Sequence, residues 1–168
     1  KSQAGGDTLS EVLALPPEWL GTHPLAITHG IPKLPIIIKL IDAKTDLSVQ
    51  VHPADEYALK HEGSLGKTEM WYVLEARPGA KLVYGFHHDV TPEIVREALE
   101  NRSIESLLNH VSVHKDDLFY IEAGTVHAIG AGCLVAEIQE SSNITYRLYD
   151  YVRIDANGKP RPLHVEKA

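Results

Sequence analysis

The sequence predicts a mainly β domain, built as a sandwich or a barrel with a short α-helical insertion. Three observations predict it: short segments rich in β-branched and aromatic residues follow residue 35, turn residues separate them, and one helical pattern interrupts the series. The chain has 168 residues, of which 43% are hydrophobic, as in one ordinary globular domain. A coiled coil, a collagen and a disordered tail are therefore excluded.

The predicted strands are short and are distributed along most of the chain. They span residues 36–41, 47–52, 70–75, 81–86, 118–122, 134–139 and 144–149. The helical insertion begins at Thr91, where a capping residue, a first-turn proline and an early acid precede apolar residues at helical spacing as far as Leu99. A second short helix is predicted over residues 104–108.

Residues 1–34 are predicted to form an irregular or helical N-terminal segment. Pro16 and Pro17 end a short helical pattern over residues 10–15, and residues 21–24 (GTHP) are expected to form a loop. The domain therefore covers residues 35–168. Because the sequence does not begin with methionine, we expect it to be part of a longer protein.

The net charge, the apolar runs and the cysteine content limit which classes of partner and which cellular compartment are expected. The net charge of −7 provides no net positive field that would attract nucleic acid or anionic lipid. Lys39 interrupts the longest apolar run, which is shorter than the roughly 18 residues that a membrane span needs. Cys133 has no second cysteine to pair with, and residues 1–6 lack the apolar core of a signal peptide. We therefore expect a cytoplasmic protein whose partner is a small molecule or another protein.

Three segments contain side chains that bind metals. In the sequence SVQVHP, strand alternation puts Gln50 and His52 on one face, although a solvated strand surface would show the same pattern. In GKTEMWYVL, Glu69 begins an apolar strand and is either functional or the partner of Lys67 in a surface ion pair. In GTVHAIG, His127 follows a glycine turn and is either a satisfied core residue or a ligand.

Taken together, these side chains form a ligand set for a divalent metal. Gln50, His52, Glu69 and His127 offer an amide oxygen, two imidazoles and a carboxylate, which suits Zn²⁺ or another divalent first-row metal. With one carboxylate against a dication, the site would keep a charge of about +1. It could then act as a Lewis acid on a bound hydroxyl or carbonyl group.

Four motifs resemble those of type I phosphomannose isomerases, which are zinc-dependent cupins. They are SVQVHP, GKTEMWY, GTVHA and TYRLYDY, and they occur in the family's order and at similar spacing. The resemblance extends from about residue 35 to residue 167. It implies a cupin-type jelly-roll β-barrel with one Zn²⁺ per chain on the four ligands above. It also implies interconversion of mannose 6-phosphate and fructose 6-phosphate through a cis-enediol.

The chain departs from the usual cupin pattern in its first motif, and from some phosphomannose isomerases at one further position. Gln50 replaces the first histidine of the first motif, and 16 residues separate His52 from Glu69; phosphomannose isomerases share both departures. Asn143 stands where some members of that family carry aspartate. If that aspartate is their base, the role must fall here to Glu137, to Lys67 or to a metal-bound water.

The remaining predicted site residues are ionic or hydroxylic. Arg147 lies at the position of the family's active-site arginine, which implies a role in stabilising charge at the enediol. Glu137, a lone acid on an apolar strand, is either inward and catalytic or outward and solvated. Lys67 completes the predicted catalytic set. Lys39 and Ser48 are the predicted phosphate ligands, because cations and hydroxyls suit phosphate oxygens, although Lys39 could instead extend to the domain surface.

Two other functions fit parts of this pattern. One is a cupin dioxygenase with an Fe(II) centre of two histidines and one carboxylate, and the other is a sugar-phosphate-binding cupin without catalysis. Gln50 as a fourth ligand, with Lys67 and Arg147 nearby, favours a redox-silent metal and a phosphorylated substrate. No site role is predicted for the other histidines, namely His23, His29, His61, His87, His88, His110, His114 and His164.

Overall fold

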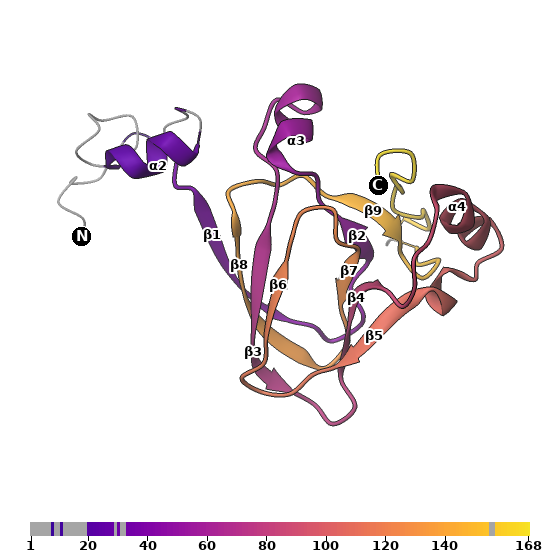
Figure 1. The fold of residues 1–168 in the computed structure, drawn as a ribbon. Coiled ribbons are helices and arrows are strands. Elements are labelled where there is room, and N and C mark those ends of the chain that lie inside the picture. The colour runs from indigo at the N-terminus through magenta and orange to yellow at the C-terminus, as the bar shows by residue number, and fades with distance from the viewer. Residues whose placement is uncertain (1–7, 9–10, 12–19, 29, 31–32, 155–156) are drawn as a thin grey trace.

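The computed structural model describes residues 8, 11, 20–28, 30, 33–154 and 157–168. Within these described residues, nine strands form two antiparallel sheets, which enclose the interior of the domain (Figure 1). The four-stranded sheet has the order β1 (Ile36–Asp42), β8 (Cys133–Glu140), β3 (Glu69–Ala76) and β6 (Leu118–Ile121). The five-stranded sheet has the order β5 (Leu108–Ser112), β4 (Lys81–Phe86), β7 (His127–Ile129), β2 (Val49–Val51) and β9 (Tyr146–Tyr149). The predicted mainly β class is confirmed.

The helices lie outside the two sheets (Figure 1). They are α2 (Thr22–Ile27), α3 (Asp55–His61), α4 (Pro92–Glu100) and a 3-10 turn (Ile104–Ser106). The helix α4 is the predicted insertion: the Thr91 side chain accepts the N–H of Ile94, and Pro92 occupies the first turn. Among the described residues, no helix is long and apolar enough to cross a membrane.

One end of the space between the sheets is a continuous apolar core. Its largest fully buried members are Trp71, Leu82 and Ile121. They pack with Val73, Val113, Ile129, Cys133 and Val135. Strand alternation explains this arrangement, because every second residue of β8, and of β3 as far as Val73, is buried between the sheets.

The structure corrects the prediction for two segments. Residues 21–24, expected to be a loop, contain the start of α2, because a proline is tolerated within the first helical turn. Residues 104–108, expected to be a helix, form a single 3-10 turn, and Leu108 already begins β5. The helical pattern predicted for residues 10–15 lies outside the described residues, apart from residue 11.

Three further elements were not predicted. The strand β5 has a polar sequence and pairs with β4 alone, at the edge of its sheet, so it shows little hydrophobic alternation. The strand β7 has only three residues and is too short for a periodic signal. The helix α3 has seven residues and buries one of them, Ala58, so an amphipathic pattern is absent.

Candidate active site

The four predicted metal ligands meet beside the apolar core, whose Trp71 donates its Nε1–H to Glu69 Oε1 at 3.0 Å. Gln50 and His127 are paired across β2 and β7, His52 follows β2, and Glu69 begins β3 in the other sheet. His127 Nε2 lies 3.2 Å from His52 Nε2 and 3.3 Å from Gln50 Nε2. The Glu69 carboxylate lies 3.4 Å from His127 Nε2 and 3.5 Å from His52 Nε2. Both histidines and Glu69 are buried, and their donor atoms could hold one metal ion.

The spacing of these atoms suits a tetrahedral ion. Zinc bonds of about 2.0–2.1 Å place the ligand atoms of a tetrahedron about 3.3–3.4 Å apart. The closest approaches among His52, Glu69 and His127, 3.2 to 3.5 Å, are near that value. Two atoms of the cluster, Glu69 Oε2 and His52 Nδ1, are buried without a hydrogen-bond partner among the described residues. A metal ion would satisfy the carboxylate oxygen, whose only charged neighbour among the described lysines and arginines is Lys67, at 3.4 Å.

The protonation states of His127 and Glu69 also fit a metal. The Nδ1–H of His127 donates to the Thr125 carbonyl oxygen at 2.8 Å, so Nε2 presents its lone pair to the cluster. Burial lowers the pKa of His127 to about 4, which leaves the ring neutral. Burial alone would raise the pKa of Glu69, but the neighbouring His52, His127 and Lys67 lower it to about 2. Neutral imidazoles and an ionised carboxylate are the forms that bind metals.

A close approach of two loop segments brings His52 and Glu69 together. Gly66 lies against the backbone that follows His52: a Cβ at this position would be 2.5 Å from the carbonyl carbon of Ala54. The Gly66 N–H donates to Asp55 Oδ1 at 2.7 Å. Only glycine allows this contact, which explains the need for glycine in the GKTE motif.

A cavity of about 520 Å³ adjoins the metal cluster, and Gln50 belongs to both. All the predicted catalytic and phosphate-binding residues line it: Lys39, Ser48, Lys67, Glu137 and Arg147. Sheet register places them there. Gln50 lies between His127 and Arg147 in one sheet, and Glu137 lies between Lys39 and Trp71 in the other.

Two lysines at the cavity are paired with buried carboxylates. Lys39 Nζ lies 2.8 Å from Glu137 Oε1, while 41% of its side chain stays exposed. Lys67 Nζ lies 3.4 Å from Glu69 Oε2 and is buried. Burial lowers the pKa of Lys67, against the opposing effect of Glu69. Glu137 therefore faces inward, and the Lys67–Glu69 pair forms inside the domain rather than on its surface.

Arg147 differs from these lysines in its partners. Its Nε donates to Ser48 Oγ at 3.3 Å and its Nη1 to the carbonyl oxygen of Pro162 at 3.0 Å. Both acceptors are neutral, and among the described residues Arg147 makes no ion pair. Burial lowers the pKa of Arg147, although an arginine keeps its proton in proteins. The cavity thus contains a positive charge that forms no ion pair with a carboxylate of the described residues.

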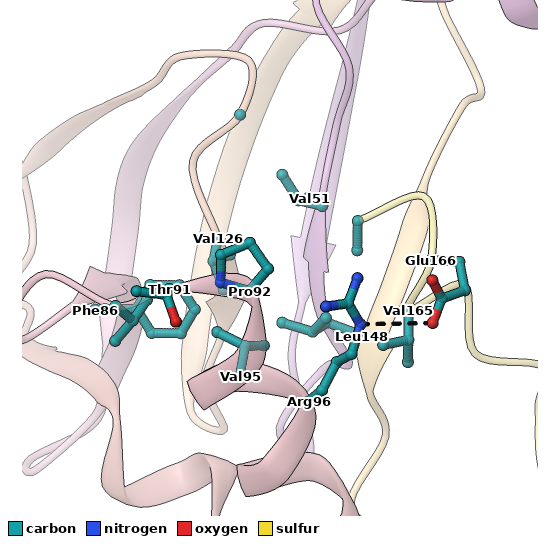
Figure 2. A pocket seen from close by; sticks show the side chains of 13 residues that line it. Val51, Phe86, Thr91, Pro92, Val95, Arg96, Val126, Leu148, Val165 and Glu166 are labelled. Carbon is teal, nitrogen blue, oxygen red and sulfur yellow. Dashed lines mark ion pairs between the residues drawn. The ribbon is translucent and has the colours of Figure 1, made fainter.

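A second cavity, of about 360 Å³, lies between α4 and the end of the chain (Figure 2). Its wall is mostly apolar and includes Val51, Val95 and Leu148, while Arg96 pairs with Glu166 at 3.7 Å. Val51 and Leu148 face away from the side that carries Gln50 and Arg147. The ionisable cluster and this apolar cavity are therefore on opposite sides of the five-stranded sheet.

Three residues near the site were not predicted to have a role there. Arg161 lines the first cavity and binds Asp150, and His164 bonds to the backbone of Arg147. Asp150 lies within the motif TYRLYDY, so the sequence contained a signal that could have indicated a role for it near the site. Arg161 and His164 lie in an irregular segment, where no periodic pattern indicates which way a side chain points.

Comparisons with known proteins agree with this geometry. No protein-family model matches the chain. It is 50% identical over 137 residues to mannose-6-phosphate isomerase ManA of Bacillus subtilis (strain 168), which covers 81% of this chain and 43% of that protein. The crystal structure of mannose 6-phosphate isomerase from Bacillus subtilis superposes with a TM-score of 0.77 at 38% identity, over 87% of this chain and 47% of that one.

A more distant structure, of a mannose 6-phosphate isomerase bound with zinc and yttrium, shares the fold. Its TM-score is 0.55 at 15% identity, over 84% of this chain and 55% of that one. The chain thus spans less than half the length of the Bacillus subtilis relative. By sequence and by fold, most of this chain is similar to part of the mannose-6-phosphate isomerases of Bacillus subtilis, and its fold is of the cupin type.

Proposed function

We propose that this chain carries the active site of an aldose-ketose isomerase that interconverts mannose 6-phosphate and fructose 6-phosphate through a cis-enediol. One observation carries the proposal: a buried His-Glu-His cluster adjoins a cavity with an unneutralised arginine. A metal and a cationic wall are what a phosphorylated sugar with a developing enediolate requires. The names of the relatives support this substrate.

The proposed cofactor is one Zn²⁺ per chain, bound by Gln50, His52, Glu69 and His127 within a metal-binding domain over residues 35–168. An amide binds metal through its oxygen. Gln50 can present that atom, because a 180° flip of its side-chain amide exchanges the positions of Oε1 and Nε2. When bound, the ion would supply Lewis-acid stabilisation to substrate oxygens. We further propose that the protein works in the cytoplasm.

The reaction moves a proton between C1 and C2, and two groups on the cavity wall can carry it. The buried Lys67 amine has a lowered pKa, which brings it closer to the working pH of a proton carrier. Glu137 is buried and is held in place by Lys39. The pH dependence of kcat in Lys67→Met and Glu137→Gln will separate the two roles.

The cationic side chains are proposed to bind different negative charges of the substrate. Arg147 stabilises the enediolate, because its guanidinium is fixed and carries no carboxylate partner. Lys39 and Ser48 receive the phosphate at the exposed side of the cavity, where the Lys39 side chain is 41% open to solvent.

A coupled mannose 6-phosphate isomerase assay tests the proposal. Turnover should be lost on chelation, return with added Zn²⁺, and be absent in His127→Ala. Zinc-loaded protein that binds fructose 6-phosphate without turnover would overturn it in favour of a non-catalytic sugar-phosphate-binding cupin. Turnover that survives complete removal of metal would overturn the metal's role.

A further inference from the structure

The last part of the described chain runs back along β9. This strand is an edge of its sheet, and Ile154 pairs with Pro160 where the chain returns. The N–H of Arg147 donates to His164 Nδ1 at 3.1 Å, and the N–H of His164 donates to the Arg147 carbonyl oxygen at 2.8 Å. The segment 160–164 thus occupies both backbone groups of Arg147 at the open edge of the sheet.

The same segment also fixes the Arg147 side chain. The Pro162 carbonyl accepts from Nη1, and Ser48 on the opposite side accepts from Nε. An arginine side chain loses much rotamer entropy when it is fixed, so its direction depends on such anchors. Because both anchors are neutral, they orient the guanidinium and leave its charge available to a substrate anion.

Ion pairs hold the segment 160–164 and the residues that follow it against the rest of the domain. The Asp150 carboxylate accepts from Nε and Nη2 of Arg161, at 2.7 and 2.5 Å. Further along, Glu166 pairs with Arg96 on α4, as Figure 2 shows, and Lys167 donates to Glu62 at 2.7 Å. Asp150 is buried, whereas the other pairs are largely exposed and add little.

We propose that the segment 160–164 is a positioning element, in which His164 and Pro162 aim the Arg147 guanidinium at the cavity. The role of Arg147 in this inference rests on the proposed function, whereas the positioning itself rests on the contacts described above. The alternative is a purely structural role, in which the segment only covers the edge of β9.

Substitution of His164 separates the two roles. His164→Asn keeps an acceptor near the place of Nδ1, whereas His164→Leu removes it. We expect kcat/KM for mannose 6-phosphate to fall about tenfold in His164→Leu, with unchanged zinc content, and to recover to within about threefold of wild type in His164→Asn. Arg96→Gln, which breaks the exposed pair with Glu166, is the matched control and should leave activity unchanged.

A double-mutant cycle with Arg147→Ala decides whether His164 acts through the arginine side chain. The backbone partner of His164 remains in Arg147→Ala, so a structural role would cost activity equally in both backgrounds. We expect His164→Leu to have no further effect once the Arg147 side chain is gone. An equal loss in both backgrounds, or no loss in either, would overturn the inference.

A spectroscopic signal keeps this test independent of turnover. The side-chain Nε–H signal of Arg147, assigned by its absence in Arg147→Ala, should shift or broaden in His164→Leu and stay in place in His164→Asn. If wild-type protein loaded with zinc shows no turnover, the proposed function fails while this signal still decides the positioning. A signal that is unchanged in His164→Leu would contradict the inference.

Discussion

The two ends of the barrel interior are built from the same strands and differ in chemistry. In β8, the inward residues Cys133 and Val135 belong to the apolar core, and the next inward residues, Glu137 and Gln139, are buried and polar. In β3, the order along the chain is reversed, with Glu69 first and the apolar Trp71 after it. One end is thus packed like an ordinary core, and the other is an array of ionisable groups.

This contrast shows how the fold separates stability from chemistry. A close-packed apolar end tolerates no change of volume without a cost in free energy of unfolding. The polar end gains less from burial, because each charge has to be satisfied by another charge or by a bound ion. The predictions below substitute residues at one end and measure the consequence at both.

The largest effect is expected at the metal cluster. Glu69→Gln keeps the shape of the side chain and removes its charge, so zinc should be lost and kcat/KM should fall by more than about a hundredfold. Metal analysis and the coupled assay measure both quantities. Glu122→Gln changes an exposed acid after β6 and is the matched control. Full zinc content in Glu69→Gln would refute the assignment of Glu69 as a ligand.

The apolar end should respond in the opposite way. Leu82 is 1% exposed in the apolar core, and Leu82→Ala should lower the free energy of unfolding by about 2–4 kcal/mol. Urea denaturation of the zinc-loaded protein measures this loss. The kcat of the folded variant should stay within about twofold of wild type. A large fall in kcat at full zinc occupancy would mean that the two ends are coupled.

Asp150 should contribute stability that depends on pH. Burial would raise the pKa of its carboxyl group, but the hydrogen bonds from Arg161 and Arg153 lower it below its usual value. A lowered pKa in the folded state stabilises the fold above the unfolded-state pKa, near 3.9, and this contribution disappears as the pH falls. Asp150→Asn should therefore cost about 1–3 kcal/mol at pH 7 and less at pH 3.

Urea titrations of wild type and Asp150→Asn at several pH values measure that difference. Asp89→Asn, an exposed acid before α4, serves as the control and should show no such trend. A cost for Asp150→Asn that stays constant down to pH 3 would show that the ion pairs contribute nothing and that only shape matters.

The smallest effect is expected on the outer surface. Lys115 and Glu75 form an ion pair at 3.1 Å, and both side chains are mostly exposed to solvent. Surface pairs of this kind contribute little, so Lys115→Gln should leave both the unfolding midpoint and kcat unchanged within error. A clear change in either would show that surface charge acts on the interior, contrary to the separation described above.

Much of this arrangement was predictable because strand alternation and short motifs act locally. The shared face of Gln50 and His52, and the capped start of α4 at Thr91, follow from neighbouring residues, whereas the sequence left open whether that face points inward. The pairing of Lys39 with Glu137 does not, because it depends on the register between β1 and β8. For Glu69, the sequence offered two alternatives, a functional residue or an ion-pair partner of Lys67. The two are compatible, because Glu69 contacts Lys67 and also belongs to the candidate metal cluster.

The central claim, that the polar end of the barrel is a zinc site, has one direct test. Diffraction data collected at the zinc absorption edge, from crystals grown without added metal, locate any bound zinc by its anomalous signal. We expect a single strong peak within about 2.0–2.2 Å of His52, Glu69 and His127. Protein that is active and contains zinc, with its anomalous peak anywhere else, would contradict the claim.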